Sequence, residues 1–100
     1  MRKITIQAIR AFLNGDNFKL SNTKVSYCEH KETSYLYLFN NLIAKLDHHN
    51  KELTITTAGW NTTTTRERLN GLPRVDVYQI NWQLYLNGQP WDGKLTTIKL

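Results

Sequence analysis

The stretch that decides the fold is LTITTAGWNTTTTRERLNGL, which runs from Leu53 to Leu72. In its first part Leu53 and Ile55 alternate with polar residues, and this period of two is typical of a half-buried strand. Gly59 ends the run, because glycine weakens a strand and permits a bend. The stretch therefore predicts a strand that turns directly into another element.

Four consecutive threonines open the second part of the stretch. Thr64 and Glu67 have the spacing of a capping box, in which each side chain accepts a hydrogen bond from the other residue's backbone amide. We therefore expect a helix that begins near Thr64. Asn70 and Gly71 predict a left-handed C-cap, and Pro73 prevents the helix from continuing.

This predicted helix has only about two turns, whereas an isolated helix needs ~12 residues. Packing against the rest of the chain must therefore hold it in place. Its expected anchors are Trp60, Leu69 and Leu72.

A second helix is predicted near the N-terminus, from Ile4 to Leu13. Thr5 is its candidate cap, and Asn14-Gly15 is its stop. The segment from Asp16 to Thr23 is polar and typical of turns. The apolar residues of the helix recur at helical spacing, which predicts one buried face. They are Ile6, Ala8, Ile9, Phe12 and Leu13.

Two hairpins follow from alternating patterns. The first runs from Thr33 to Leu46 with a turn predicted at Asn40-Asn41, and both of its faces are largely apolar, so we expect it to be central and covered on both sides. The second has a predicted turn at Ile80-Asn81. Its inner face carries Val75, Val77, Leu84 and Leu86, and its outer face carries Asp76, Tyr78, Gln83 and Tyr85.

These elements predict an α+β fold in one domain, residues 1–100. The N-terminal helix and the short central helix pack on a mainly antiparallel β-sheet built of hairpins, and a last strand lies between Lys94 and Leu100. One hundred residues with 40% hydrophobic content suffice for a core without disulfides or metals.

The charge balance favours anionic partners. Thirteen Lys and Arg against eight Asp and Glu give a net charge of +5, which attracts nucleic acid or an acidic protein surface. The positive charges are spread along the chain, so a generally solvated basic surface is the competing interpretation. A single cysteine, Cys28, is consistent with a reducing cytosol, and no apolar run approaches a membrane span. We expect a soluble, cytoplasmic protein.

Catalytic and metal sites find little support in the sequence. Asp47-His48-His49 lacks the spaced partners of a zinc site and is better interpreted as a turn. Cys28 and His30 lack a recognisable third member of a catalytic triad, and no glycine-rich phosphate loop is present. We therefore predict a protein that is not an enzyme and that has no cofactor and no metal.

One candidate binding surface follows from the central stretch. Hydroxyl groups, the amides of a helix start and guanidinium groups all suit phosphate, although threonines can equally cap the helix and arginines can simply solvate it. Together they predict a basic, hydroxyl-rich end of the domain. The residues are Thr62, Thr63, Arg66, Arg68 and Arg74.

Aromatic residues of the C-terminal part add two further candidates. Tyr85 and Trp91 can stack bases or anchor a protein interface, and for Trp91 core packing is an equal alternative. For Trp82 we expect core packing.

Several motifs stand out in the chain: Asn41-Leu-Ile-Ala-Lys45, Leu53-Thr-Ile-Thr56, Ala58-Gly-Trp60 with Thr64-Thr65 and Arg68-Leu-Asn70, and Tyr85-Leu-Asn-Gly88 with Trp91-Asp-Gly93. Together they resemble small proteins encoded by bacteriophages and prophages, over about Ile4 to Gly93. The resemblance implies a phage origin, the bacterial cytosol and action by binding. We therefore expect a non-catalytic binding protein whose partner is a host protein that handles nucleic acid, such as a restriction or CRISPR defence component. Direct binding of DNA or RNA is the first alternative and a structural role in the virion the second.

Overall fold

The computed structural model describes all 100 residues and begins with helix α1, Lys3–Asn14. The predicted stop is confirmed, because Gly15 has a φ of 74° and donates its amide to the carbonyl of Ala11. The predicted cap is wrong: Thr5 lies inside the helix and is fully buried. Ile6 and Leu13 are exposed, so the buried face is narrower than expected.

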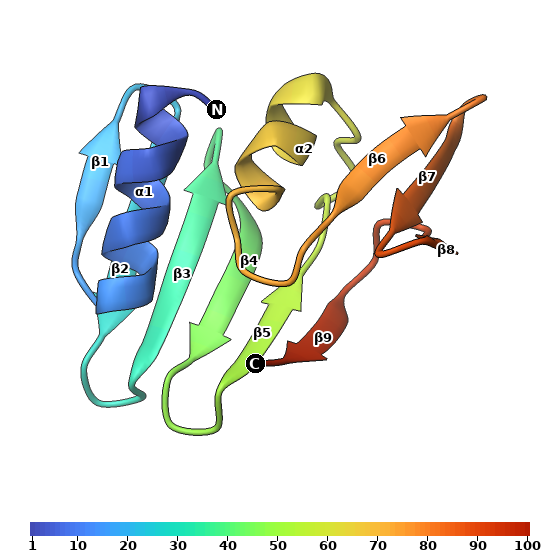
Figure 1. The fold of residues 1–100 in the computed structure, drawn as a ribbon. Coiled ribbons are helices and arrows are strands. Elements are labelled where there is room, and N and C mark those ends of the chain that lie inside the picture. The colour runs from blue at the N-terminus through green and yellow to red at the C-terminus, as the bar shows by residue number, and fades with distance from the viewer.

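A six-stranded antiparallel sheet forms the second layer (Figure 1). Its strand order is β1-β2-β3-β4-β5-β9. The strands are β1 (Phe18–Leu20), β2 (Thr23–Cys28), β3 (Thr33–Leu38), β4 (Asn41–Asp47), β5 (Glu52–Ile55) and β9 (Thr96–Lys99). Strand β5 is the strand predicted by the opening stretch, and the C-terminal β9 pairs with it as the last strand of the sheet.

The β3–β4 hairpin turns one residue earlier than predicted. Leu38 pairs with Asn41, and the turn residues Phe39 and Asn40 both have positive φ, 51° and 64°. Two such residues form the turn whose twist matches that of the strands, which explains the shift. A bulge then allows two consecutive residues of β4, Ile43 and Ala44, to face the core.

Helix α2 (Thr63–Leu69) and a small second sheet complete the chain. This sheet contains β6 (Val77–Ile80), β7 (Gln83–Leu86) and β8 (Gln89–Pro90). The predicted inward face of the β6–β7 hairpin is confirmed by buried Val77 and Leu86. Its turn is at Asn81-Trp82, one residue later than predicted, because both residues have positive φ.

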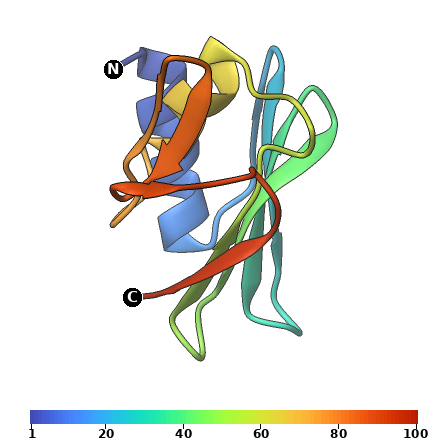
Figure 2. The same cartoon turned by 90° about the vertical axis from the view of Figure 1, so that its right-hand side faces the viewer.

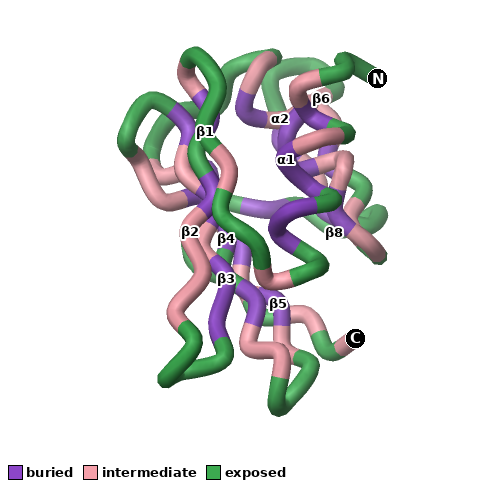
Figure 3. Tube along the Cα trace, turned by 90° about the vertical axis from the view of Figure 1, so that its left-hand side faces the viewer, coloured by how far each residue is buried: buried purple, intermediate pink, exposed green.

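All of these additional elements lie on one face of the six-stranded sheet. α1, α2 and the β6–β7 hairpin gather on that face, and the opposite face has nothing packed on it (Figures 2 and 3). The core between the layers contains Phe12, Leu36, Leu53 and Leu69, each with no exposed area. The predicted α+β fold is therefore confirmed, and the expectation that the β3–β4 hairpin is covered on both sides is wrong.

Candidate functional site

The start of α2 differs from the predicted capping box. Thr62 is the N-cap, and its Oγ1 accepts a hydrogen bond from the backbone amide of Thr65 at 3.1 Å. Glu67 does not complete the box, because its carboxylate accepts hydrogen bonds from Thr5 on α1 and from the Arg2 amide. The sequence pattern predicted the start of the helix to within a residue or two, but the N-cap is Thr62 and not Thr64.

The end of α2 also differs from prediction. Asn70 has an ordinary helical φ of −69°, and its side chain bonds the backbone of Val77 in both directions, at 2.6 and 2.9 Å. Gly71 does not have a positive φ. A Cβ placed on Gly71 would lie 2.8 Å from Ile9 Cγ1 and 2.9 Å from Thr5 Cγ2. Glycine is therefore needed here for the close approach of α1.

Arg68 is buried instead of contributing to a basic surface. Only 1% of this residue is exposed. Its guanidinium donates to Thr23 Oγ1 on β2 at 3.1 Å, to Thr5 Oγ1 on α1 at 2.8 Å and to the carboxylate of Glu67. Burial of the Glu67 carboxyl opposes ionisation, but the hydrogen bonds from Thr5 and Arg2 and the charge of Arg68 together lower its pKa. Arg68 therefore links two helices to the sheet.

The other predicted basic and hydroxyl residues fall into two groups. Thr62, Thr63 and Arg66 lie together, and Arg66 donates to Asn61 Oδ1 at 2.6 Å and to Gln79 Oε1 at 3.0 Å. Arg74 is exposed elsewhere and donates to the carbonyl of Lys99 at 3.3 Å. The expectation of one basic end formed by all five residues is therefore wrong.

The C-terminal aromatic residues are also divided between core and surface. Trp91 is 8% exposed, and its Nε1 donates to Thr96 Oγ1 at 2.8 Å, so it belongs to the core. Tyr85 is half-buried and stacks on Tyr78 with the ring centres 5.3 Å apart. Trp82 is 92% exposed at the turn of its hairpin, which corrects the expectation that it packs in the core.

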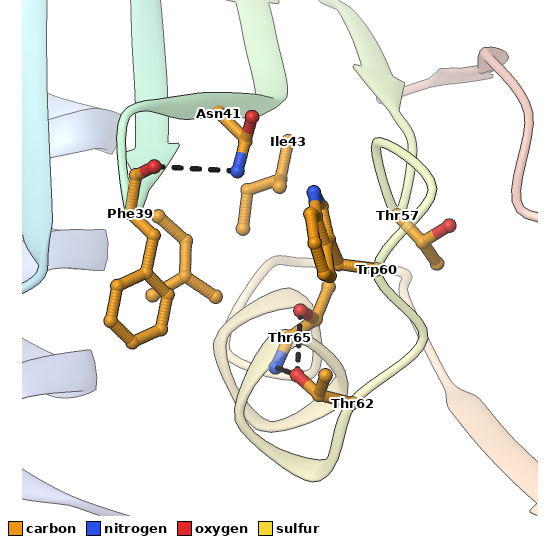
Figure 4. A pocket seen from close by; sticks show the side chains of 8 residues that line it. Phe39, Asn41, Ile43, Thr57, Trp60, Thr62 and Thr65 are labelled. Atoms are coloured by element: carbon orange, nitrogen blue, oxygen red, sulfur yellow. Dashed lines mark hydrogen bonds between the residues drawn. The ribbon is translucent and has the colours of Figure 1, made fainter.

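A groove of about 370 Å³ opens between the β3–β4 hairpin and the start of α2 (Figure 4). Its floor contains buried Leu38 and Ile43. Phe39 and Trp60 lie on either side of this floor and are 63% and 60% exposed. The prediction that Trp60 anchors α2 is therefore wrong. The remaining residues that line the groove are Asn41, Thr57, Thr62 and Thr65.

Turn geometry explains why these two aromatic side chains are exposed. Phe39 occupies the first turn position of the β3–β4 hairpin, and its amide donates to the carbonyl of Asn22 at 2.9 Å. Trp60 follows the Ala58-Gly59 turn, where both residues have positive φ, and its amide donates to Thr57 at 2.9 Å. In both cases the main chain is held while the side chain points outward. A turn placed at Phe39-Asn40 would have predicted the exposure of Phe39.

Positive charge lies beside the groove on the far side of Phe39. Phe39 also lines a smaller neighbouring pocket of about 190 Å³, which Lys19 and Lys24 line from β1 and β2. Both lysines are exposed. An occupant of the groove that extends past Phe39 therefore meets two ammonium groups.

His48 and His49 have local partners, whereas Cys28 is a free, half-buried cysteine. His48 Nε2 lies 2.7 Å from Ser34 Oγ, and His49 Nδ1 lies 3.8 Å from Glu32. The backbone amide and side chain of Asn50 lower the pKa of Asp47, whose carboxylate closes this turn. No three His, Cys, Asp or Glu side chains are close enough to share a metal ion. No helix is long and apolar enough to span a membrane.

The fold and the site define a small α+β protein with an aromatic-sided groove. Residues 1–98 match the family model of the Kyanoviridae Gp96 protein, and the chain belongs to this family of bacteriophage proteins. A search of curated proteins and a search of solved structures each found no match. The predicted relationship to phage-encoded proteins is therefore confirmed.

Proposed function

We propose that this phage protein is a non-catalytic binding protein and that its target is a host protein that handles nucleic acid, such as a restriction or CRISPR defence component. It acts in the cytoplasm of the bacterial host and uses no cofactor. The groove supports this proposal, because Phe39 and Trp60 stand exposed around an apolar floor. Large aromatic residues around a pocket are typical of the residues that dominate protein interfaces.

The charge beside the groove determines which kind of partner surface the protein binds. Lys19 and Lys24 border Phe39, and the whole chain carries a net charge of +5. A nucleic-acid-binding groove of a host protein is itself basic and would repel these lysines, whereas an acidic patch would attract them. The proposed partner therefore presents an apolar side chain within an acidic segment.

Fluorescence of Trp60 provides a direct measurement. Replacing Trp82 by Phe leaves two tryptophans, and buried Trp91 is protected from a neutral quencher such as acrylamide. The test titrates this variant with acidic peptides that carry one central Leu or Phe. We expect a blue-shifted emission and protection of Trp60, with weaker binding when the central residue is Ser or when the acidic residues are Lys.

Substitutions then test the same groove with the host partner. We expect a partner captured from host extract by the wild type to bind Phe39→Ala and Trp60→Ala at least about 30-fold more weakly, the effect of losing an interface hot spot. Trp82→Ala is the matched control, because it removes a tryptophan that is even more exposed than Trp60 but lies outside the groove. It should bind as the wild type does.

Three outcomes would contradict the proposal. Equal capture by wild type and both groove variants would remove the groove from the interface. A captured partner whose contact surface is basic would refute the charge argument. Concentration-dependent self-association that is lost in Trp60→Ala would assign the groove to a second copy of the chain, as in a virion component.

A further inference from the structure

The uncovered face of the six-stranded sheet carries a regular arrangement of tyrosine and lysine. Both helices and the small sheet lie on the other face (Figures 2 and 3). The strand register places Lys24 directly opposite Tyr37, and Tyr35 directly opposite Lys45. Lys19 lies opposite Lys24 on the next strand, so it belongs to the same row. This sheet face is defined here by Lys19, Lys24, Tyr35, Tyr37 and Lys45.

Burial confirms that these side chains point away from the core. The neighbours of Tyr35 and Tyr37 on the same strand, Ser34, Leu36 and Leu38, are buried, whereas the two tyrosines are only half-buried. The three lysines are exposed. Alternation along a strand places such residues on opposite faces of the sheet.

The contacts within the sheet face keep the rings and charges close together. The Lys24 ammonium lies 5.6 Å from the centre of the Tyr37 ring, within the range of a cation–π interaction. Tyr35 and Tyr37 are two residues apart on β3, a separation of roughly 6.6 Å along a strand. Each ring can therefore offer its surface to a separate planar group, with an ammonium group nearby.

Acidic residues of this face are confined to the far end of the strands. Asp47 and Glu52 are paired there. The carboxylate of Asp47 already accepts hydrogen bonds from the amides of His49 and Asn50. The end that carries Lys19, Lys24 and Tyr37 has no acidic residue in its rows.

We infer that this sheet face binds single-stranded nucleic acid. Unpaired bases stack on the rings of Tyr35 and Tyr37, and the three lysines neutralise the phosphates alongside. Duplex is disfavoured because its bases are already stacked on each other. A protein partner is disfavoured across this face, because Lys is depleted from the centres of protein interfaces and here it alternates with the rings. At the groove, by contrast, Lys19 and Lys24 lie only at the rim, where interfaces are polar.

Fluorescence anisotropy with labelled 12-nucleotide oligo-dT and oligo-U tests the inference on the full chain. Three phosphate contacts predict a slope of about −2.1 for the logarithm of affinity against the logarithm of salt, so affinity should fall about 20-fold between 50 and 200 mM NaCl. Lys24→Ala with Lys45→Ala should reduce the slope to about −0.7. A labelled duplex of equal length should bind more weakly.

Tyrosine variants test stacking separately from charge. Tyr35→Ala and Tyr37→Ala should each weaken binding about 5- to 150-fold, the range measured for loss of a stacking ring. Tyr35→Phe and Tyr37→Phe keep the ring and should bind within about twofold of the wild type. Because the alanine variants could be less stable, their folding is checked by circular dichroism, and the phenylalanine variants separate stacking from structure.

A matched charge control uses the other side of the molecule. Lys3→Ala with Arg10→Ala removes two exposed positive charges from α1 and gives the same net charge as the double lysine variant. It should retain the wild-type slope at the same salt concentrations. Trp60→Ala should also bind oligonucleotide normally, so failure here and failure of the groove proposal are distinguishable.

Each of three results would overturn the inference. No anisotropy change at 50 mM NaCl would exclude the sheet face as a nucleic-acid site. Equal binding of duplex and single strands, unaffected by Tyr37→Ala, would show general polyelectrolyte attraction only. An equal loss of affinity in the α1 control variant and in the double lysine variant would show that total charge, and not this face, determines binding.

Discussion

Replacing Arg68 by methionine removes a buried charge at the point where α1, β2 and α2 meet. Methionine keeps much of the aliphatic volume but has no donor. Thr23 Oγ1 loses the hydrogen bond from Arg68 Nε, and Thr5 Oγ1 loses the one from Arg68 Nη1. Glu67 loses its only ionic partner. We therefore predict that this substitution strongly destabilises the fold.

The size of the effect follows from the surroundings of Glu67. Removing one partner of a buried ion pair costs about 3–5 kcal/mol. The Glu67 side chain is 24% exposed and keeps its hydrogen bonds from Thr5 and the Arg2 amide, so the lower value of about 3 kcal/mol applies. For a domain of this size that corresponds to a fall in Tm of about 12–24 °C.

Urea unfolding followed by circular dichroism gives the free energy of unfolding for a double-mutant cycle. Arg68→Met with Glu67→Gln should cost about 1 kcal/mol or more less than the sum of the two single changes, because the double variant has no uncompensated charge. A loss below about 1 kcal/mol for Arg68→Met alone would refute the argument that this guanidinium links the helices to the sheet.

The pH dependence of stability tests the same site independently. The folded pKa of Glu67 lies below its ordinary value of 4.5, so the carboxylate stabilises the fold above that pH. This contribution is lost as the pH falls below 4.5 towards the folded pKa. The stability difference between wild type and Glu67→Gln should therefore be constant near neutral pH and shrink in acid. A stability difference between the two proteins that does not change with pH would contradict this prediction.

Four further substitutions test three local features by urea unfolding. Thr62→Ala should cost about 1 kcal/mol of stability because the N-cap is lost, while Thr64→Ala should cost almost nothing. A larger loss for Thr64→Ala than for Thr62→Ala would instead support the capping box predicted for Thr64 and Glu67. Gly71→Ala should cost about 1–3 kcal/mol, because its Cβ meets Ile9, and an unchanged stability would show that α1 can move. Trp91→Phe should cost about 1 kcal/mol for the lost Nε1 hydrogen bonds, and no loss would indicate that water replaces them.

The sequence predicted the class of fold well because the periodic patterns are strong. Leu53 and Ile55 alternate in β5, and Ala8, Ile9 and Phe12 recur at helical spacing, so their buried faces are set by local patterns. Strand β1 could not be predicted, because its three residues are polar or half-exposed and gain order only by pairing with β2. The hairpin turns were misplaced by one residue because aromatic residues occupy positions that usually contain Asn or Gly.

The candidate site was harder to predict because it depends on tertiary contacts. Arg66, Arg68 and Arg74 look equivalent in sequence, yet one bonds the neighbouring loop, one is buried and one is exposed. Nothing local distinguishes them, since two of the three hydrogen-bond partners of Arg68, Thr23 and Thr5, lie 45 and 63 residues away. The sequence did not predict that Phe39 and Trp60 are exposed, because large aromatic residues are usually expected in the hydrophobic core.

The uncovered sheet face also affects how this protein can change over generations. Side chains such as Lys24, Tyr37 and Lys45 point away from the core, so substituting them alters charge and shape without creating a cavity beneath. Their alternating neighbours Leu36 and Ala44 are constrained by packing. A phage lineage can therefore vary one side of each strand to match a changing target while the other side keeps the same architecture.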